Sequence, residues 1–207
     1  MGGGSNPLGR TKLSGRNMIR EIITNKKTLR QTSVLSNIDK SSLLVGKDLI
    51  DTLVETWKTP IIGLAIAAPQ IGRFERIIAV ANNGQNVDDI EVMFNPNITY
   101  KSGKQVFWEY CMSGLSELSK VERPHIVEVT YYGENRNKKT TVKKGLDAIV
   151  LCHEIDHLDG IISQDIAIKN IRCKDADEAQ SLKAKLRMDE PLAVLDYGKE
   201  PLCEVLL

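Results

Sequence analysis

The clearest periodic pattern in this chain lies between Ser42 and Trp57, where apolar side chains recur every three or four residues. The apolar positions are Leu43, Leu44, Leu49, Ile50, Leu53, Val54 and Trp57. This spacing is typical of a helix with one buried face. Ser41 or Ser42 can cap its first turn, and Pro60 prevents its continuation.

Shorter apolar runs in the middle of the chain predict a series of strands. They are Arg76–Val80, Ile90–Phe94, Ile98–Tyr100, Val106–Tyr110, Ile126–Tyr132 and Thr140–Val142, with a hairpin turn at Gly133–Asn137. Two more helices are expected, an apolar one over Gly145–Leu158 and a solvated one with alternating charges over Ala176–Met188. Because strands come in runs and helices are few, the pattern predicts an α+β fold.

Composition and charge narrow the range of functions. The chain has 207 residues, of which 42% are hydrophobic and 27% charged, as in an ordinary globular domain. Its 28 Lys and Arg nearly balance 27 Asp and Glu, and aromatic residues make up 5%. These values favour neither a nucleic acid nor a membrane as the main partner. The longest apolar run, 61–69, is far shorter than the roughly 20 residues of a membrane span.

The strongest chemical signal is His153-Glu154-Ile155-Asp156-His157. Two histidines four residues apart lie on one face of a helix, so both rings can bind one metal ion. Glu154, next to the first histidine, can act on a water at that metal. The alternative is a chance pair of histidines with a solvated glutamate.

A catalytic site of this kind needs a third ligand, and the cysteines are the obvious candidates. Four cysteines scattered along a chain without a secretory signal favour a reduced compartment, in which a cysteine binds metal or is inert. Cys111, at the end of a predicted strand, ranks first. Cys152 points about 100° away from His153, while Cys173 and Cys203 remain open.

Three motifs in order resemble those of the peptide deformylases, metal hydrolases that remove formyl groups from new polypeptides. Gly63–Gln70 (GLAIAAPQ) resembles a glycine-rich motif of that family, Glu109–Ser113 (EYCMS) its cysteine motif, and His153–Leu158 (HEIDHL) its histidine motif. The resemblance extends over about Ile19–Ile168. It implies small antiparallel or mixed sheets packed around a central helix that carries the histidines.

The resemblance also assigns roles to individual residues. It makes Cys111, His153 and His157 the metal ligands, and Glu154 the general acid and base. The Gln70 amide and the Met112 backbone N–H become donors to the formyl oxygen. Losing one such donor typically costs about 3–4 kcal/mol of transition-state stabilisation.

Further residues are expected around these groups. The resemblance and spacing place the substrate-binding residues at Gly63, Leu64, Ala65, Tyr110, Ile149 and Val150. For Leu64, Ile149 and Val150, a place in the ordinary hydrophobic core is an equally good interpretation. Glu109 and Arg123 are expected either to pair and fix the Cys111 strand or to form a solvated surface pair. Asp156 either joins that network or is exposed.

The resemblance implies one divalent metal ion, Fe²⁺ in the cell, with Zn²⁺, Ni²⁺ or Co²⁺ as substitutes. The implied substrates are formyl-methionyl peptides, from which formate is released, and the implied compartment is the bacterial cytoplasm or an organelle matrix. Residues 18–207 are then a single catalytic domain. Residues 1–17, rich in Gly, Ser and Asn, are expected to be a disordered tail or an added linker, with an organellar targeting segment as the rival.

The C-terminal extension, residues 169–207, lies beyond the motifs and has an uncertain role. It is expected to be a packing and solubility segment, and ribosome docking is the alternative. Its apolar end, Cys203–Leu207, predicts an edge strand.

Three residues in or next to the motifs depart from the family pattern. Ala65 and Tyr110 replace glycines, and Cys152 replaces a glutamine. A side chain at the first two positions can obstruct the substrate, and a phenol can also add a stacking contact. One rival function is therefore a degenerate deformylase-like protein, acting as a binding module or on another formylated substrate. The other is a metallopeptidase whose third ligand is Asp159, Asp165 or Glu178.

Overall fold

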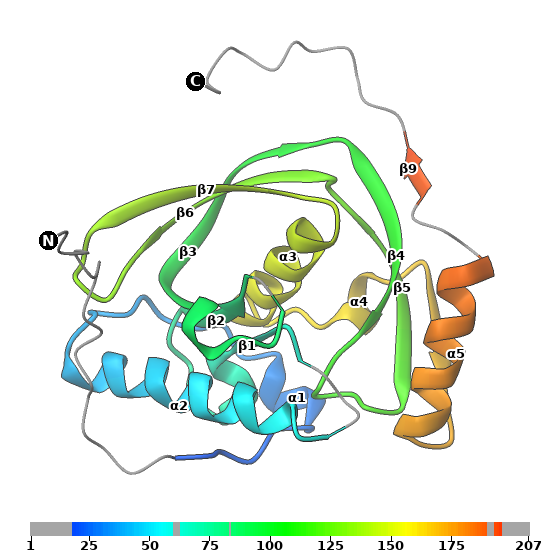
Figure 1. Cartoon of the computed structure of the whole chain (residues 1–207), viewed down its shortest axis with the longest axis horizontal. Helices are drawn as coiled ribbons and strands as arrows, with labels where there is room; N and C mark the ends of the chain where they lie inside the picture. Colours follow the sequence, from blue (N-terminus) through cyan, green and yellow to red (C-terminus); the bar gives the residue numbers. More distant parts are fainter. Residues whose placement is uncertain (1–17, 60–62, 83, 190–192, 196–207) are drawn as a thin grey trace, which may run out of the picture.

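The computed structural model describes residues 18–59, 63–82, 84–189 and 193–195 (Figure 1). The expected tail 1–17 and the expected strand Cys203–Leu207 lie outside these residues. The helices are α1 (Lys26–Leu29), α2 (Lys40–Thr56), α3 (Leu146–Leu158), α4 (Ser163–Ile166) and α5 (Ala176–Asp189), with short 3₁₀ turns η1 (Ala68–Ile71) and η2 (Val87–Asp89). The strands are β1 (Ala65–Ala67), β2 (Ile77–Ala81), β3 (Ile90–Ser102), β4 (Lys104–Tyr110), β5 (Glu117–Arg123), β6 (Ile126–Tyr132), β7 (Lys138–Lys144), β8 (Lys169–Arg172) and β9 (Ala193–Leu195).

The strands form two antiparallel sheets, which confirms the α+β prediction. One sheet has the order β1-β2-β3-β6-β7 and the other the order β8-β5-β4-β9. In Figure 1 the two sheets curve around α3, α2 runs beneath β1 and β2, and α5 lies outside β4 and β5.

Helix α3 lies at the centre of the molecule, and most of its residues are buried. Leu151, Ile155 and Leu158 are buried in a cluster with residues of β1, β2 and β6. The polar residues of α3 are therefore carried into the interior, where burial costs free energy unless they find partners.

Helix α2 is confirmed, but its predicted cap is wrong. The helix begins at Lys40, and its cap is Asp39, whose carboxylate accepts hydrogen bonds from the N–H groups of Ser41 and Ser42 at 2.9 and 3.0 Å. An aspartate carboxylate satisfies two backbone donors at once, so the cap is Asp39 and not Ser41 or Ser42. The buried face of α2 packs against β1, β2 and η1.

Strand β3 joins two segments that were predicted as separate strands. Its pairing with β6 shifts register between Phe94 and Asn97, and Asn95 has a φ of 52°. Pro96, which lacks an N–H, sits inside this irregularity, where no ladder bond is needed. A bulge thus keeps the strand continuous across a proline.

The C-terminal segment is more closely integrated than a solvated helix would be. Strand β8 pairs with β5, and β9 pairs with β4. On α5, Ala179 is buried, and Leu182 and Leu186 pack against the Trp108 and Leu118 cluster. The prediction of a solvated helix is wrong for the face that carries Ala179, Leu182 and Leu186. These apolar residues recur every three or four positions among the charged ones, which gives the helix one buried side.

Candidate active site

Three potential metal ligands converge where β4 ends against α3. His153 and His157 lie one turn apart on α3, with ring centroids 4.9 Å apart and ring planes at 90°. Cys111 follows the last residue of β4, and its Sγ lies 3.2 Å from His157 Nε2. The three donor atoms lie within 4.8 Å of one another, and all three residues are buried. One cation can contact all of them at once.

The surroundings of the histidines and the thiol fit a divalent metal. His153 Nδ1 lies 2.9 Å from a Glu109 carboxylate oxygen, which leaves Nε2 to face Cys111. A carboxylate behind a ligand histidine fixes its tautomer and orientation. Burial alone would raise the pKa of the Cys111 thiol, but the charges of His157 and His153 lower it well below its usual range. Thiolate and imidazole are ligands that Zn²⁺ and Fe²⁺ accept.

A buried ion pair lies behind this group. Arg123 Nε donates to Glu109 Oε1 at 2.6 Å, Arg123 Nη2 donates to Glu109 Oε2 at 3.0 Å, and a third bond joins Arg123 to Asp156. Burial opposes ionisation of Glu109, yet hydrogen bonds from His153 and Arg123 lower the pKa of this carboxyl to about 2. The structure therefore places Glu109 and Arg123 in the interior, where they connect β4, β5 and α3.

Glu154 is buried beside the ligands and keeps one oxygen unpaired. Among the described residues, nothing hydrogen-bonds its Oε2 or His157 Nδ1. Burial raises the pKa of Glu154 to about 7, and a nearby cation would lower it again. A carboxylate aimed into a pocket with no protein partner is suited to exchange protons with a bound molecule.

Gln70 is held by its carbonyl end, so its amide NH₂ is directed at the site. The Ala67 N–H donates to Gln70 Oε1 at 2.8 Å. Gln70 Nε2 lies 3.6 Å from Cys111 Sγ and 3.3 Å from Ser113 Oγ. Ser113 also donates its backbone N–H toward Cys111 Sγ, at 3.4 Å.

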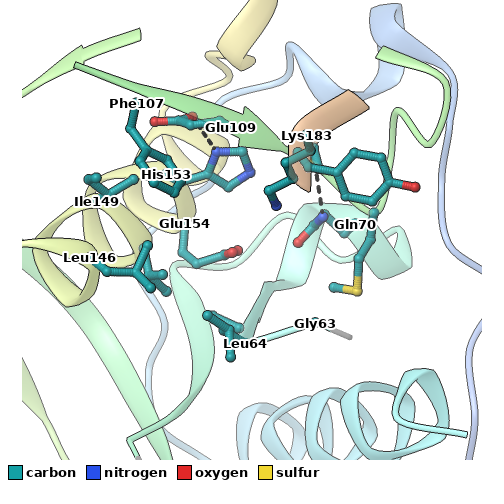
Figure 2. A pocket seen from close by; sticks show the side chains of 15 residues that line it. Gly63, Leu64, Gln70, Phe107, Glu109, Leu146, Ile149, His153, Glu154 and Lys183 are labelled. Carbon is teal, nitrogen blue, oxygen red and sulfur yellow. Dashed lines mark hydrogen bonds and ion pairs between the residues drawn. The ribbon is translucent and has the colours of Figure 1, made fainter. Parts of the chain in front are cut away.

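A pocket of about 100 Å³ opens onto these groups. Every residue expected to bind substrate lines it, namely Gly63, Leu64, Ala65, Tyr110, Ile149 and Val150. Gln70, Cys111, Met112, His153 and Glu154 line it as well, whereas His157 and Arg123 are not among its lining residues. Figure 2 shows Leu64, Leu146 and Ile149 on one side of the pocket with Glu154 between them and Gln70.

Three lining residues were not predicted to bind substrate: Phe107, Leu146 and Lys183. Phe107 stands two residues before Glu109 on a predicted strand, so it points to the same face. Leu146 precedes Ile149 and Val150 by one helical turn. Both could have been predicted from the spacing of the residues around them. Nothing in the sequence linked Lys183, on α5, to the site.

The departures from the family pattern have distinct surroundings. Cys152 is buried in the core cluster between α3 and the first sheet, where burial raises the pKa of its thiol to about 11. Ala65 is buried in the same cluster as well as lining the pocket. At the neighbouring Gly63, a Cβ would lie 2.7 Å from Met112 Sδ, so the Met112 side chain would have to shift.

A buried Cys-His-His group beside a glutamate, inside an antiparallel α+β fold, defines a metallohydrolase. Comparison with known proteins narrows this class. A family model described as polypeptide deformylase matches residues 19–172. The chain belongs to the peptide deformylase family.

Two curated relatives illustrate the similarity. "Peptide deformylase 2" of Clostridium acetobutylicum is 36% identical over 135 residues, which cover 65% of this chain and 85% of that relative. The peptide deformylase of Acetivibrio thermocellus is 35% identical over 144 residues, or 70% of this chain and 80% of the relative.

Solved structures agree with this assignment. The peptide deformylase from Legionella pneumophila has a TM-score of 0.66 and 26% identity, and the match covers 82% of this chain and 96% of that one. The peptide deformylase from Synechococcus elongatus, solved with actinonin, has a TM-score of 0.65 and 27% identity, covering 84% and 90%. In the part of the chain that the structure describes, we find no helix with the length and apolar character needed to cross a bilayer.

Proposed function

We propose that this chain hydrolyses the formyl group from the N-terminal formyl-methionine of nascent polypeptides and releases formate. The observation that carries the proposal is the convergence of Cys111, His153 and His157 with an unpaired Glu154 and an oriented Gln70 around one pocket. The three ligand residues would hold one divalent metal. When bound, that cation supplies a nucleophile at neutral pH by acidifying water, and it polarises the formyl carbonyl.

The residues of the chain perform the remaining steps. Glu154 accepts the proton that water loses as its oxygen adds to the formyl carbon, and then donates it to the leaving nitrogen. The C–N bond breaks, and the products are formate and a free amino terminus. The Gln70 amide and the Met112 N–H donate hydrogen bonds to the formyl oxygen as it gains negative charge. Leu64, Ile149 and Val150 supply an apolar wall for the methionine side chain.

We assign Fe²⁺ as the metal in the cell, with Zn²⁺, Ni²⁺ and Co²⁺ as substitutes. One thiolate and two imidazoles accept all four ions, so the ligand set alone does not choose among them. Iron predicts sensitivity to oxygen. Air-purified protein should be less active than anaerobic protein at equal metal content, and equal activity would count against iron.

The test of the function uses anaerobic protein loaded with Fe²⁺ or Ni²⁺ and a short formyl-Met peptide. Formate is measured by a coupled assay and the peptide products by mass spectrometry. We expect formate and the deformylated peptide, and a large loss of rate in Glu154→Gln at unchanged metal content. Internal peptide fragments would indicate a metallopeptidase instead. No formate from a fully metallated protein would refute the proposal.

Because the proposed substrates are new polypeptides, we further place the protein near the ribosome, in a bacterial cytoplasm or an organelle matrix. Co-sedimentation with ribosomes that carry nascent chains tests the association. Recovery of the protein only in the ribosome-free fraction would contradict it.

A further inference from the structure

Helix α5 contributes to the wall of the pocket, although it follows the residues that match the deformylase family model. Lys183 of α5 lines the pocket together with His153 and Glu154. Figure 2 shows Lys183 across the pocket from Leu64. A substrate in this pocket therefore meets α5 in addition to the residues of the three motifs.

Tyr110, which stands where the family motif has glycine, connects α5 to the pocket. Successive side chains of a strand point to opposite faces of its sheet, so on β4 Tyr110 shares a face with Trp108. Trp108 is buried in a cluster with Ala179 of α5, and Tyr110 packs against this cluster. Because Tyr110 is the last residue of β4, its side chain also lines the pocket. The ring therefore lies between the pocket and α5.

The ring of Tyr110, and not its hydroxyl, makes the contact with α5. The hydroxyl is buried, and none of the described residues hydrogen-bonds it. A buried hydroxyl without a partner costs free energy, so it does not hold the side chain in this place. Leu182 and Leu186 of α5 pack on the same cluster as the ring, and Lys183 Nζ lies 5.2 Å from the ring centre, within the range of a cation–π interaction. The ring is thus fixed from the side of α5.

The rim formed by Tyr110 and Lys183 lies close to the proposed reacting centre. Tyr110 directly precedes Cys111, so their Cα atoms are about 3.8 Å apart. An extended peptide advances about 3.3 Å per residue. When the formyl group is at the proposed ligands, the first or second residue after formyl-Met therefore passes this rim. A glycine in place of Tyr110 would leave the space of the ring open.

We propose that the rim of Tyr110 and Lys183 determines specificity by size and selects substrates with a small side chain at the first or second residue after formyl-Met. The inference rests on the proposed function. Its basis is steric, because the ring can make room for a bulky side chain only by disturbing the packing of α5. The rim meets the substrate away from the reacting bond, so a bulky residue should raise KM more than it lowers kcat.

The experiment compares kcat/KM for two pairs of amidated peptides, formyl-Met-X-Ala and formyl-Met-Ala-X, with alanine or phenylalanine at X. These side chains are uncharged, so the comparison measures size and not charge. We expect the wild-type protein to favour alanine in at least one pair by about tenfold, a scale that the shape of a pocket can reach. Most of the difference should lie in KM.

Variants decide whether the rim is responsible for this alanine-to-phenylalanine ratio. Tyr110→Ala should bring the ratio to about one at unchanged metal content, whereas Tyr110→Phe, which keeps the ring and removes the unpaired hydroxyl, should keep it. Lys183→Ala shortens the part of the rim that belongs to α5 and leaves the ring in place, so its ratio should lie between those of wild type and Tyr110→Ala. Lys185→Ala, at an exposed position of α5, is the matched control and should keep the ratio.

The outcomes separate this inference from the function beneath it. A wild-type ratio of about one or less in both pairs, or a ratio that neither Tyr110→Ala nor Lys183→Ala lowers, would overturn the inference while deformylation stands. Loss of the ratio in Tyr110→Phe would assign the selection to the hydroxyl, and an equal loss in Lys185→Ala would assign it to α5 in general; either result would also overturn the inference. Absence of formate release from every peptide would refute the proposed function and the inference together.

Discussion

The buried carboxylate of Glu109 links the chemistry to the scaffold. The carboxylate accepts hydrogen bonds from Arg123 and also contacts His153 Nδ1. It therefore holds the proposed ligand His153 by the ring nitrogen that does not face the metal site. Partners of this kind orient ligand histidines, and their loss typically weakens metal binding by about 10–100-fold.

Glu109→Gln should therefore lower the affinity for the metal by about that factor while the protein remains folded. The amide keeps the shape of the carboxylate but removes its charge from both Arg123 and His153. Competition with a chelator measures the affinity, and circular dichroism checks the fold. Glu122→Gln is the matched control, since Glu122 lies on the neighbouring strand β5 and pairs with Lys104 at the surface. Equal affinity in wild type and Glu109→Gln would show that this contact does not hold the ligand.

The individual site residues could be predicted because each belongs to a motif with its own chemistry. The i, i+4 spacing of His153 and His157 already places both rings on one face of a helix. Arg123 was harder, because nothing local distinguishes a buried ion pair from a surface pair until β4 and β5 are paired. Lys183 could not be found, since only tertiary packing brings α5 to the pocket.

Among the elements, the turn after α3 depends on a glycine for two separate reasons. Gly160 has a φ of 73°, and a Cβ there would lie 2.6 Å from the backbone oxygen of Arg30. Gly84 has a similar φ of 75°, but nothing lies within 4 Å of its Cβ position. The two positions share the conformational demand and differ in the available space.

Gly84→Ala should lower the free energy of unfolding by about 1–2 kcal/mol, the cost of a left-handed conformation for an L-residue. Gly160→Ala should lower it by clearly more, because the Arg30 backbone must also move. Urea unfolding of both variants measures the difference. Equal losses of unfolding free energy in the two variants would mean that the backbone around Arg30 can move at no cost and does not constrain the end of α3.

The cap of α2 gives this helix a dependence on pH. Hydrogen bonds from the side chain of Ser41 and the backbone of Ser42 hold the pKa of Asp39 below its usual range. Because its pKa is lower in the folded state than in the unfolded state, the Asp39 carboxylate stabilises the folded protein. This stabilisation is complete at pH values above the unfolded-state pKa, and it is lost as the pH falls through the folded-state pKa.

Asp39→Ala should therefore lower the urea midpoint at pH 6, and the gap to wild type should shrink toward pH 3. Asp39→Asn, which keeps an oxygen acceptor but does not titrate, is the control, and its midpoint should lie closer to wild type at pH 6. A gap between Asp39→Ala and wild type that stays constant from pH 6 to pH 3 would show that the carboxylate charge contributes nothing.

Helices and strands in which apolar residues recur regularly were predicted well. Those with polar residues at buried positions were not. The expected helix Gly145–Leu158 corresponds to α3, and Ile126–Tyr132 corresponds to β6. Strand β5 was missed because Ser119 and Arg123 occupy buried positions in it, which hides the apolar alternation. Its buried arginine is compensated by Glu109 of β4 and Asp156 of α3, which both pair with it.

At the scale of the whole molecule, the site lies where the two sheets and the central helix meet. Helix α3 packs on the first sheet and brings His153, Glu154 and His157, while β4 of the second sheet ends directly before Cys111. A metal held by these residues would connect the two sheets through three side chains. Which segments meet in this way depends on long-range pairing, so the α+β class could be predicted from the sequence but the sheet order could not.

The central claim is that Cys111, His153 and His157 together bind one divalent metal. Anaerobic titration with Co²⁺, followed by absorption spectroscopy, tests it most directly, because a cysteine thiolate bound to cobalt produces a charge-transfer band. We expect one Co²⁺ per chain with such a band in the wild type and in Cys152→Ala, whose thiol is buried in the core. The band should disappear in Cys111→Ala. A band that persists in Cys111→Ala, or one that depends on Cys152, would contradict the account.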